Sequence, residues 1–175
     1  MKTQQGFAVW ITGIPASGKS SITGELVKKI RGLGIAVVVL ESDEMRTILT
    51  PKATYDPEER DRFYHTLVLI GEVIARNGIS VVFDATANKR YYRDYARSRI
   101  KKFIEVYVRC SLEVCIKRDP KGIYHRAASG ETATVPGIQT PYEPPLDAEI
   151  TLNGQDAPDS GADTILSVLK KLNYI

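Results

Sequence analysis

The chain has 175 residues, of which 43% are hydrophobic and 26% are charged, and its formal net charge is +3. This length and apolar content suit a single well-buried domain covering residues 1–175. The small positive charge excludes the strongly basic nucleic-acid-binding classes but suits small anionic ligands. No apolar stretch approaches the length of a bilayer span, so we expect a soluble, cytoplasmic protein that binds neither a membrane nor nucleic acid.

Strand-like apolar runs alternate with helical patterns along the chain. We expect strands at residues 8–12, 36–40, 80–83, 103–108 and, from a weaker pattern, 149–152. The expected helices cover the segment after the first glycine-rich loop and residues 57–76, 90–101 and 164–172. This alternation predicts an α/β fold, a three-layer sandwich whose central parallel sheet of about five strands carries helices on both faces.

The first expected strand is followed by eight residues, Gly13 to Ser20, that fit the phosphate-binding pattern G-x-x-x-x-G-K-[ST]. Glycines let the backbone wrap a phosphate closely, and N–H groups at a helix start donate hydrogen bonds to it. Lys19 is expected to reach the β- and γ-phosphates, and Ser20 to supply an oxygen to Mg²⁺. The sequence thus predicts a P-loop NTPase-type fold with a nucleoside triphosphate bound by Gly13, Ile14, Pro15, Ala16, Ser17, Gly18, Lys19, Ser20 and Ser21.

Two aspartates follow the second and third expected strands, at the sheet edge where open α/β folds bind ligands. Asp43 could accept the proton of an attacking hydroxyl or hold Mg²⁺ through water, and Arg46, one helical turn later, could bind an anionic substrate. Asp84 is the second candidate for the metal, and the sequence leaves open which aspartate serves it. The alternative is that these carboxylates cap neighbouring helices.

Residues 119–147 are rich in Pro, Gly, Thr and Ser and keep no regular period, which predicts a long loop with one helical turn. The loop begins with four basic residues, which favour a mobile lid over a binding site: Arg118, Lys121, His125 and Arg126. We expect Arg118 to contact the nucleotide. We define residues 118–147 as the lid. A lid together with Asp43 and Arg46 favours a kinase over an ATPase or GTPase.

Other chemically active residues are interpreted as structural. Cys110 and Cys115 are expected to be ordinary buried thiols, because no second cysteine pair accompanies them to form a zinc site. His65 and His125 have no partner at metal-ligand spacing. The run from Lys89 to Arg97 mixes cations with aromatics and is interpreted as a solvated helix face rather than a nucleic-acid-binding surface.

With these residues in place, the chain resembles the adenylylsulfate kinases. This family phosphorylates the ribose 3′-hydroxyl of adenosine 5′-phosphosulfate (APS) with MgATP. The most specific likeness lies in Arg118 to Tyr124 and Pro141 to Pro145, which match the family's R-D-P-K-G-L-Y and P-Y-E-x-P blocks. The resemblance supports the lid, and it also implies a homodimer, since the family commonly dimerises.

The resemblance assigns residues to the acceptor side as well. Asp43 and Arg46 fall on the family's D-G-D-N-V-R, whose last aspartate acts at the transferring phosphate and whose arginine contacts APS. Tyr55 and Arg60 match its F-S-x-E-D-R, which helps to hold the acceptor. The implied acceptor contacts are Asp43, Arg46, Tyr55, Arg60, Thr86, Ala87, Lys121 and Ile138, and the implied catalytic residues are Lys19, Asp43 and Arg46.

The chain departs from the family on this same side. Phe63 to Leu67 stand where the family has N-I-R-R, Ala87 replaces a serine, and Val135 replaces an aromatic that stacks on adenine. Each lost contact of this kind costs about 1–3 kcal/mol. The resemblance makes an APS kinase the first hypothesis, and the lost contacts motivate a second one. The alternatives are a P-loop kinase of a different nucleotide-linked or sugar hydroxyl and a non-catalytic nucleotide-binding regulator.

Overall fold

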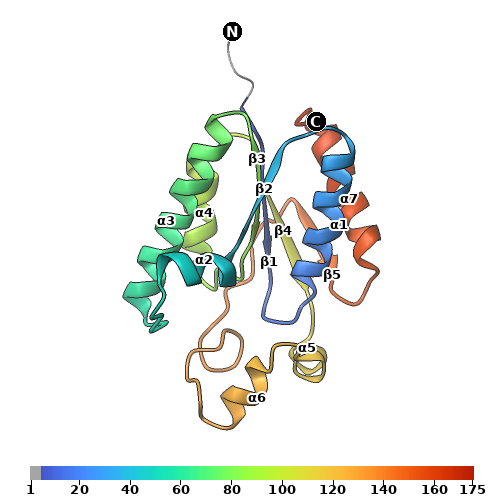
Figure 1. Ribbon diagram of the computed structural model, residues 1–175. Helices are drawn as coiled ribbons and strands as arrows, with labels where there is room; N and C mark the ends of the chain where they lie inside the picture. The colour runs from blue at the N-terminus through green and yellow to red at the C-terminus, as the bar shows by residue number, and fades with distance from the viewer. Residues whose placement is uncertain (1–4) are drawn as a thin grey trace.

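The computed structural model describes residues 5–175 and contains a five-stranded parallel sheet in the order β2-β3-β1-β4-β5 between two layers of helices (Figure 1). The strands are β1 (Ala8–Thr12), β2 (Val37–Glu41), β3 (Ser80–Asp84), β4 (Phe103–Arg109) and β5 (Ile150–Asn153). The helices are α1 (Lys19–Gly32), α2 (Ser42–Leu49), α3 (Pro57–Arg76), α4 (Arg90–Arg99), α5 (Leu112–Arg118), α6 (Ile123–Ala128) and α7 (Pro158–Lys171). The predicted α/β sandwich is confirmed.

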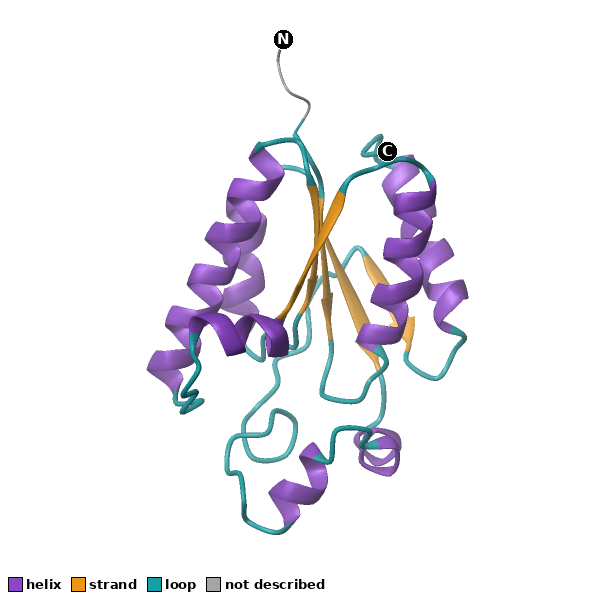
Figure 2. Ribbon diagram, in the orientation of Figure 1, coloured by secondary structure: helices purple, strands orange, loops and turns teal. Residues whose placement is uncertain are grey.

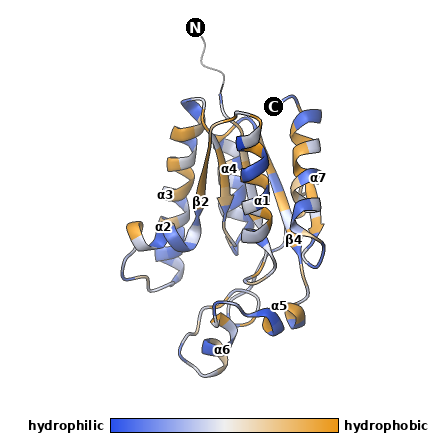
Figure 3. Cartoon of the chain, turned by 45° about the vertical axis from the view of Figure 1, so that its right-hand side comes forward, coloured by the Kyte–Doolittle hydropathy of each residue, from blue (hydrophilic) through white to orange (hydrophobic). Residues whose placement is uncertain are grey.

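The sheet is buried on both faces, because its strands are covered by helices on each side (Figures 1 and 2). On one face, Val9 and Ile11 of β1 pack in a cluster with residues of α1 and α7. On the other face, Ala8 and Trp10 of the same strand pack with residues of α3 and α4. This burial explains why the strands read as continuous apolar runs, and the sheet is coloured as hydrophobic in Figure 3.

The side chain of Trp10 connects the core to the loop that follows β3. It is fully buried and stacks on Phe83 with ring centroids 4.5 Å apart. Its Nε1 donates a hydrogen bond of 3.1 Å to the carbonyl of Ala85. A buried indole N–H that lacked such a partner would be costly, so this bond fixes the start of the loop.

Most expected elements are present, with shifted ends. The predicted helix at residues 57–76 is α3, where Pro57 takes the first turn and the Asp56 side chain caps it by accepting from the N–H of Glu59 at 2.9 Å. The last helix begins at Pro158, well before the expected residue 164. The first turns of this helix lack the periodic apolar side chains by which a helix is recognised in sequence. Gly161, for example, has no side chain, although it packs closely on Leu152.

One short helix and one buried helix face differ from the sequence prediction. α5 was not expected, and α6 is the one turn expected within the lid. The run from Lys89 to Arg97 is not a fully solvated face, because Tyr92 and Arg93 are each 1% exposed. The prediction was wrong because the burial of Arg93 depends on Glu105, a distant partner on β4.

The two cysteines and His65 behave as ordinary structural residues. Cys110 is half-buried and Cys115 is buried, and both are free thiols. Burial, followed by the neighbouring Cys110, raises the pKa of Cys115 to about 12. His65 lies against the ring of Tyr95 with centroids 4.1 Å apart. Within residues 5–175, no helix is long and apolar enough to cross a bilayer.

Candidate active site

The phosphate-binding loop lies between β1 and the start of α1, at the carboxyl edge of the sheet. Gly18 has a φ of 107°, a conformation that residues with a side chain rarely adopt. The Nζ of Lys19 donates to the carbonyls of Gly13 and Ile14 at 3.0 and 3.1 Å. Burial lowers the pKa of Lys19, while the charges of Asp84 and Asp43 act in the opposite direction. The ammonium is thus held above the loop by weak acceptors that an anion could replace.

This loop forms one wall of a cavity of about 570 Å³. The cavity is also lined by Arg118 of α5 and by Gly154 to Pro158, the connection between β5 and α7. The Nη1 of Arg118 donates to the carbonyl of Gly154 at 2.7 Å, which joins these two parts of the cavity wall. We call this space the donor cavity, since its walls contain the phosphate-binding loop.

Ser20 and Asp84 both line the donor cavity, and their hydroxyl and carboxylate groups offer oxygen atoms of the kind that Mg²⁺ binds. Asp84 is only 4% exposed, and burial raises the pKa of its carboxyl group, with Lys19 opposing the shift. Residues 5–175 contain no cluster of three or more His, Cys, Asp or Glu placed to enclose a metal. Mg²⁺ commonly uses one or two protein oxygens together with waters and phosphates, so one hydroxyl and one carboxylate fit it.

A second cavity of about 730 Å³ adjoins the first. Its walls include six of the eight expected acceptor contacts, among them Arg46, Tyr55 and Arg60. We call it the acceptor cavity. Residues that line both cavities mark the boundary between them: Pro15, Ser42, Asp43, Thr86, Lys121 and Ile123. The candidate base Asp43 therefore stands where the two cavities meet.

Arg46 is held rigidly in the wall of the acceptor cavity. Its side chain is 7% exposed, and its Nη1 lies 2.5 Å from Glu59 Oε1. The guanidinium lies over two aromatic rings, 4.0 Å from the centroid of Phe63 and 4.6 Å from that of Tyr55. A charge that is paired and packed in this way is oriented before any ligand arrives.

Arg60 is equally constrained. Its Nε donates to the carbonyl of Tyr55 at 2.9 Å, and its Nη2 donates to the carbonyl of Thr134, within the lid, at 2.6 Å. Its Nη1 donates to Asn88 Oδ1 at 3.3 Å. Arg60 therefore links α3 to the lid and to the loop after β3.

The lid reaches the boundary between the cavities through Lys121. Its Nζ donates to Asp43 Oδ2 at 2.7 Å and to Glu41 Oε1 at 3.2 Å. The hydrogen bond that Lys121 donates to Asp43 is the main cause that raises the pKa of Lys121. Tyr124 of α6 adds a second tie, since its hydroxyl donates to the carbonyl of Pro15 at 2.8 Å. The lid therefore covers the site in this structure.

Two expected acceptor contacts are not brought to a cavity wall. Ile138 is 43% exposed and lies outside both cavities. Ala87 is fully buried, and its backbone N–H donates to the hydroxyl of Tyr64 at 3.1 Å. The other expected contacts, Arg118 and Thr86 among them, do line a cavity, while Gly13, Ile14 and Ser17 build the loop beneath it.

Sequence reasoning missed several residues of the site. The loop from Gly154 to Pro158 lines the donor cavity, and its position after the fifth strand was the signal that could have revealed it. Tyr64 lines the acceptor cavity, where the sequence showed only the loss of a family motif. Val135 also lines this cavity, but its side chain is 4% exposed and packs in a lid cluster with Tyr124.

Known proteins resemble this chain along almost its whole length. The family described as adenylylsulphate kinase matches residues 5–153. An adenylyl-sulfate kinase of Rippkaea orientalis is 37% identical over 98% of this chain and 96% of its own length. A probable adenylyl-sulfate kinase of Pyrococcus abyssi is 34% identical over 98% of this chain and 99% of its own.

A solved structure gives the same result in three dimensions. The Mycobacterium tuberculosis APS kinase in complex with AMPPNP and APS superposes with a TM-score of 0.90 at 29% identity. The match covers 95% of this chain and 98% of that one.

Proposed function

The chain belongs to the adenylylsulphate kinase family, and from this premise we propose that it transfers the γ-phosphoryl group of ATP to the 3′-hydroxyl of APS. The enzyme is accordingly a phosphotransferase that acts on an alcohol group. One observation carries the proposal from family to chemistry. A cavity built on a phosphate-binding loop and a cavity walled by two fixed arginines meet at the candidate base Asp43.

The chemistry follows from this juxtaposition. The acceptor hydroxyl attacks the γ-phosphorus from the acceptor cavity, and its proton passes to the Asp43 carboxylate. A new oxygen–phosphorus bond forms as the bond to the oxygen bridging the β-phosphate breaks, so ADP remains in the donor cavity. Lys19 and the lid cations Arg118 and Lys121 neutralise charge on the transferring group and on ADP.

We propose that Ser20 and Asp84 hold Mg²⁺. The ion would supply charge neutralisation of the β- and γ-phosphates. Asp84 is the better candidate of the two aspartates, because Asp43 is already paired with Lys121. Ser20 follows Lys19 on α1. Its hydroxyl would therefore hold the metal beside the phosphates that the Lys19 ammonium binds.

Acceptor binding depends on preorganised side chains. Arg46 and Arg60 provide positive charge for the anionic phosphosulfate group, and Tyr55 provides an aromatic face. The two arginines are oriented by Glu59 and by the carbonyls of Tyr55 and Thr134 rather than by the ligand, which reduces the entropy lost on binding. We propose that this arrangement compensates for the family motif that the chain lacks after Arg60.

We also propose that the protein acts in the cytoplasm, where ATP is available, and that it forms a homodimer. The exposed apolar residues Leu69 and Val73 on α3, which are 40% and 48% exposed, support a contact between two copies. Light scattering after size-exclusion chromatography gives the mass directly, and a monomer at all concentrations would reject the dimer.

The defining experiment supplies APS and saturating MgATP and follows both ADP and 3′-phospho-APS by chromatography. Lys19→Ala should abolish product, and Asp43→Asn should lower kcat by about 10²- to 10⁴-fold. Glu44→Gln, which changes an exposed carboxylate beside Asp43, is the matched control and should retain activity. A panel of other nucleotide and sugar hydroxyls runs in parallel.

Two outcomes would contradict the proposal. ADP release with another hydroxyl but not with APS would identify a kinase of a different acceptor. Tight ATP binding without transfer to any acceptor would identify a nucleotide-binding regulator.

A further inference from the structure

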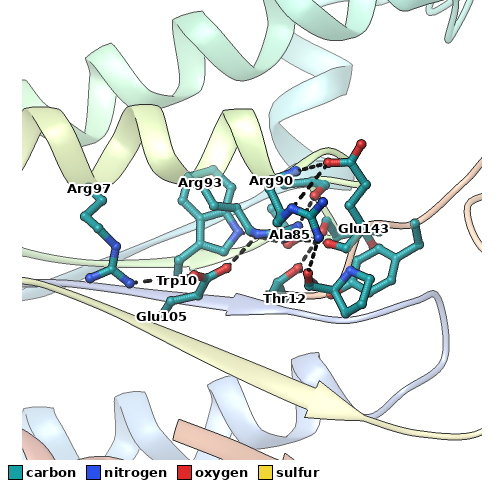
Figure 4. Close-up of polar contacts among 12 residues, drawn as sticks. Trp10, Thr12, Ala85, Arg90, Arg93, Arg97, Glu105 and Glu143 are labelled. Atoms are coloured by element: carbon teal, nitrogen blue, oxygen red, sulfur yellow. Dashed lines mark hydrogen bonds and ion pairs between the residues drawn. The ribbon is translucent and has the colours of Figure 1, made fainter. Parts of the chain in front are cut away.

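The guanidinium of Arg93 joins three segments that are distant in the sequence. Its side chain is 1% exposed, and Nε donates to Glu105 Oε1 on β4 at 2.6 Å. Nη1 donates to the carbonyl of Ala87, and Nη2 donates to the carbonyl of Glu143 at 2.6 Å (Figure 4). One side chain therefore connects the sheet, the loop after β3 and the end of the lid.

The first carbonyl that Arg93 binds belongs to a strained residue. Ala87 has a φ of 42°, in the left-handed region, which costs a non-glycine residue about 1–3 kcal/mol. Two hydrogen bonds hold it there, one from its N–H to the Tyr64 hydroxyl and one to its carbonyl from Arg93. Bonds from a charged donor to a buried carbonyl are strong enough to maintain such a conformation.

The residues on either side of Ala87 belong to the site. Thr86 lines both cavities at their boundary, and its carbonyl accepts from the hydroxyl of Thr12 at 2.6 Å. Asn88 is 3% exposed and accepts from Arg60 at 3.3 Å. The backbone turn at Ala87 therefore determines where the boundary residue and the partner of Arg60 lie.

The second carbonyl that Arg93 binds belongs to Glu143, near the end of the lid. The N–H of Glu143 donates to the carbonyl of Asn88 at 2.7 Å, and its carboxylate accepts from the N–H of Arg90 at 2.9 Å (Figure 4). The Asn88 side chain in turn donates to the carbonyl of Pro141 at 3.1 Å. The lid is thus attached to the same loop that Arg93 holds from behind.

We propose that Arg93 is a positioning residue for the phosphoryl acceptor. It lines neither cavity and touches neither substrate, and it acts by holding the loop of residues 85–88 and the end of the lid in the arrangement that shapes the acceptor cavity. The inference rests on the proposed function, since it assigns Arg93 to the acceptor side of that site.

A purely structural role would be neutralisation of Glu105. Burial raises the pKa of this carboxyl group, and the charge of Arg93 opposes the shift. Breaking a buried pair by removing one partner is strongly destabilising, whereas removing both charges is often nearly neutral. The double variant Arg93→Gln/Glu105→Gln therefore separates the two roles, because it removes the unpaired charge without restoring the guanidinium bonds to Ala87 and Glu143.

The experiment measures KM for APS, KM for ATP and kcat, together with the melting temperature. In the double variant, KM for APS should be at least about tenfold higher than in wild type, while KM for ATP should be within about twofold of wild type. Arg93→Lys should raise KM for APS as well, since one ammonium group cannot replace the forked donors of the guanidinium. Arg97→Gln, which removes the neighbouring partner of Glu105 but no bond to the loop, should leave KM for APS unchanged. Recovery of KM for APS along with melting temperature in the double variant would overturn the proposal.

Hydrogen exchange provides a readout that needs no acceptor. In the double variant, the N–H groups of Ala87 and Glu143 should exchange faster, while those of Val9 and Ile11 on β1 should not. Unchanged protection at Ala87 and Glu143 would contradict the positioning role. Failure of the proposed function is a different result, because the wild-type protein would then form no 3′-phospho-APS.

Discussion

Lys121 and Asp43 lie 78 positions apart in the chain, yet the lysine ammonium donates a hydrogen bond of 2.7 Å to the aspartate. The contact ties the lid to the candidate general base. An anionic ligand that enters between the cavities competes with Asp43 for the Lys121 ammonium. Closure of the lid is therefore coupled to whether Asp43 is paired with Lys121.

The pairing predicts how closure depends on pH. The hydrogen bond to Asp43 raises the pKa of Lys121 above its ordinary value of 10.5. A raised lysine pKa means that the stabilisation is fully present below the ordinary value and is lost as the pH rises through the raised one. Protease cleavage within the lid should be constant between about pH 6 and pH 9 and should increase only above about pH 10.5.

Lys121→Met should show increased cleavage at every pH, whereas Lys117→Met, at an exposed position just before the lid, should match wild type. Cleavage of the Lys121 variant at the wild-type rate would show that the pairing does not hold the lid.

The buried pair of Arg46 and Glu59 predicts an unequal response from two adjacent glutamates. Glu59→Ala should destabilise the protein by about 3 kcal/mol, because it leaves the Arg46 guanidinium buried without its partner. Glu58→Ala breaks the exposed pair with Arg62, whose side chains are 70% and 82% exposed, and should change stability by less than about 0.5 kcal/mol. Both glutamates occupy the first turn of α3, so helix-end effects are shared. Urea unfolding midpoints measure the difference, and equal shifts would refute the prediction.

Asp84 is expected to oppose folding at neutral pH. Burial raises the pKa of its carboxyl group, so the folded state gains stability as the pH falls and loses it as the pH rises through the raised value. Asp84→Asn should therefore melt at a higher temperature than wild type at pH 7, with a smaller difference near pH 4, while losing phosphoryl transfer.

Asp61→Asn provides a control of opposite sign. The hydrogen bond from Tyr92 lowers the pKa of Asp61, so its stabilisation is present above the ordinary pKa and is lost as the pH falls. This variant should melt lower than wild type at pH 7, and the deficit should fade in acid. The same sign of shift in both variants would contradict the assignment.

The close approach of Gly154 to the phosphate-binding loop predicts a steric effect on ATP. A Cβ at this position would lie 2.2 Å from the carbonyl oxygen of Ser17, and a backbone oxygen cannot move aside as a flexible side chain can. Gly154→Ala should cost about 1–3 kcal/mol of stability and weaken binding of an ATP analogue in calorimetry. In Gly24→Ala, by contrast, the new methyl meets nothing within 4 Å. That variant should be more stable by up to about 1 kcal/mol with unchanged affinity.

Local patterns were sufficient to predict much of the site. The strand, loop and helix around Lys19 are adjacent in sequence, so their chemistry could be read directly. Asp43 and Asp84 could be brought together because the carboxyl ends of parallel strands meet at one edge of a sheet. The resemblance then supported the lid and added acceptor-side residues such as Tyr55 and Arg60.

Pairings across the fold could not be predicted in the same way. Arg93 occurs in a run of cations that resembles a solvated helix face, and its partners Glu105 and Glu143 lie 12 and 50 positions away. Arg46 meets Glu59 only because α2 is followed by a turn into α3. A charged residue has the same local pattern whether it is buried or exposed, since its burial depends on a distant partner.

The hydrogen bond from Trp10 to Ala85 gives the protein an internal optical probe. Trp10 is the single tryptophan of the chain, and its indole N–H binds the carbonyl at the start of the loop that continues through Thr86 to Asn88. Indole emission responds to hydrogen bonding and to the polarity around the ring. A displacement of this loop would therefore change the intrinsic fluorescence of the unlabelled enzyme, so titration with the acceptor tests directly whether the loop moves, without a coupled assay.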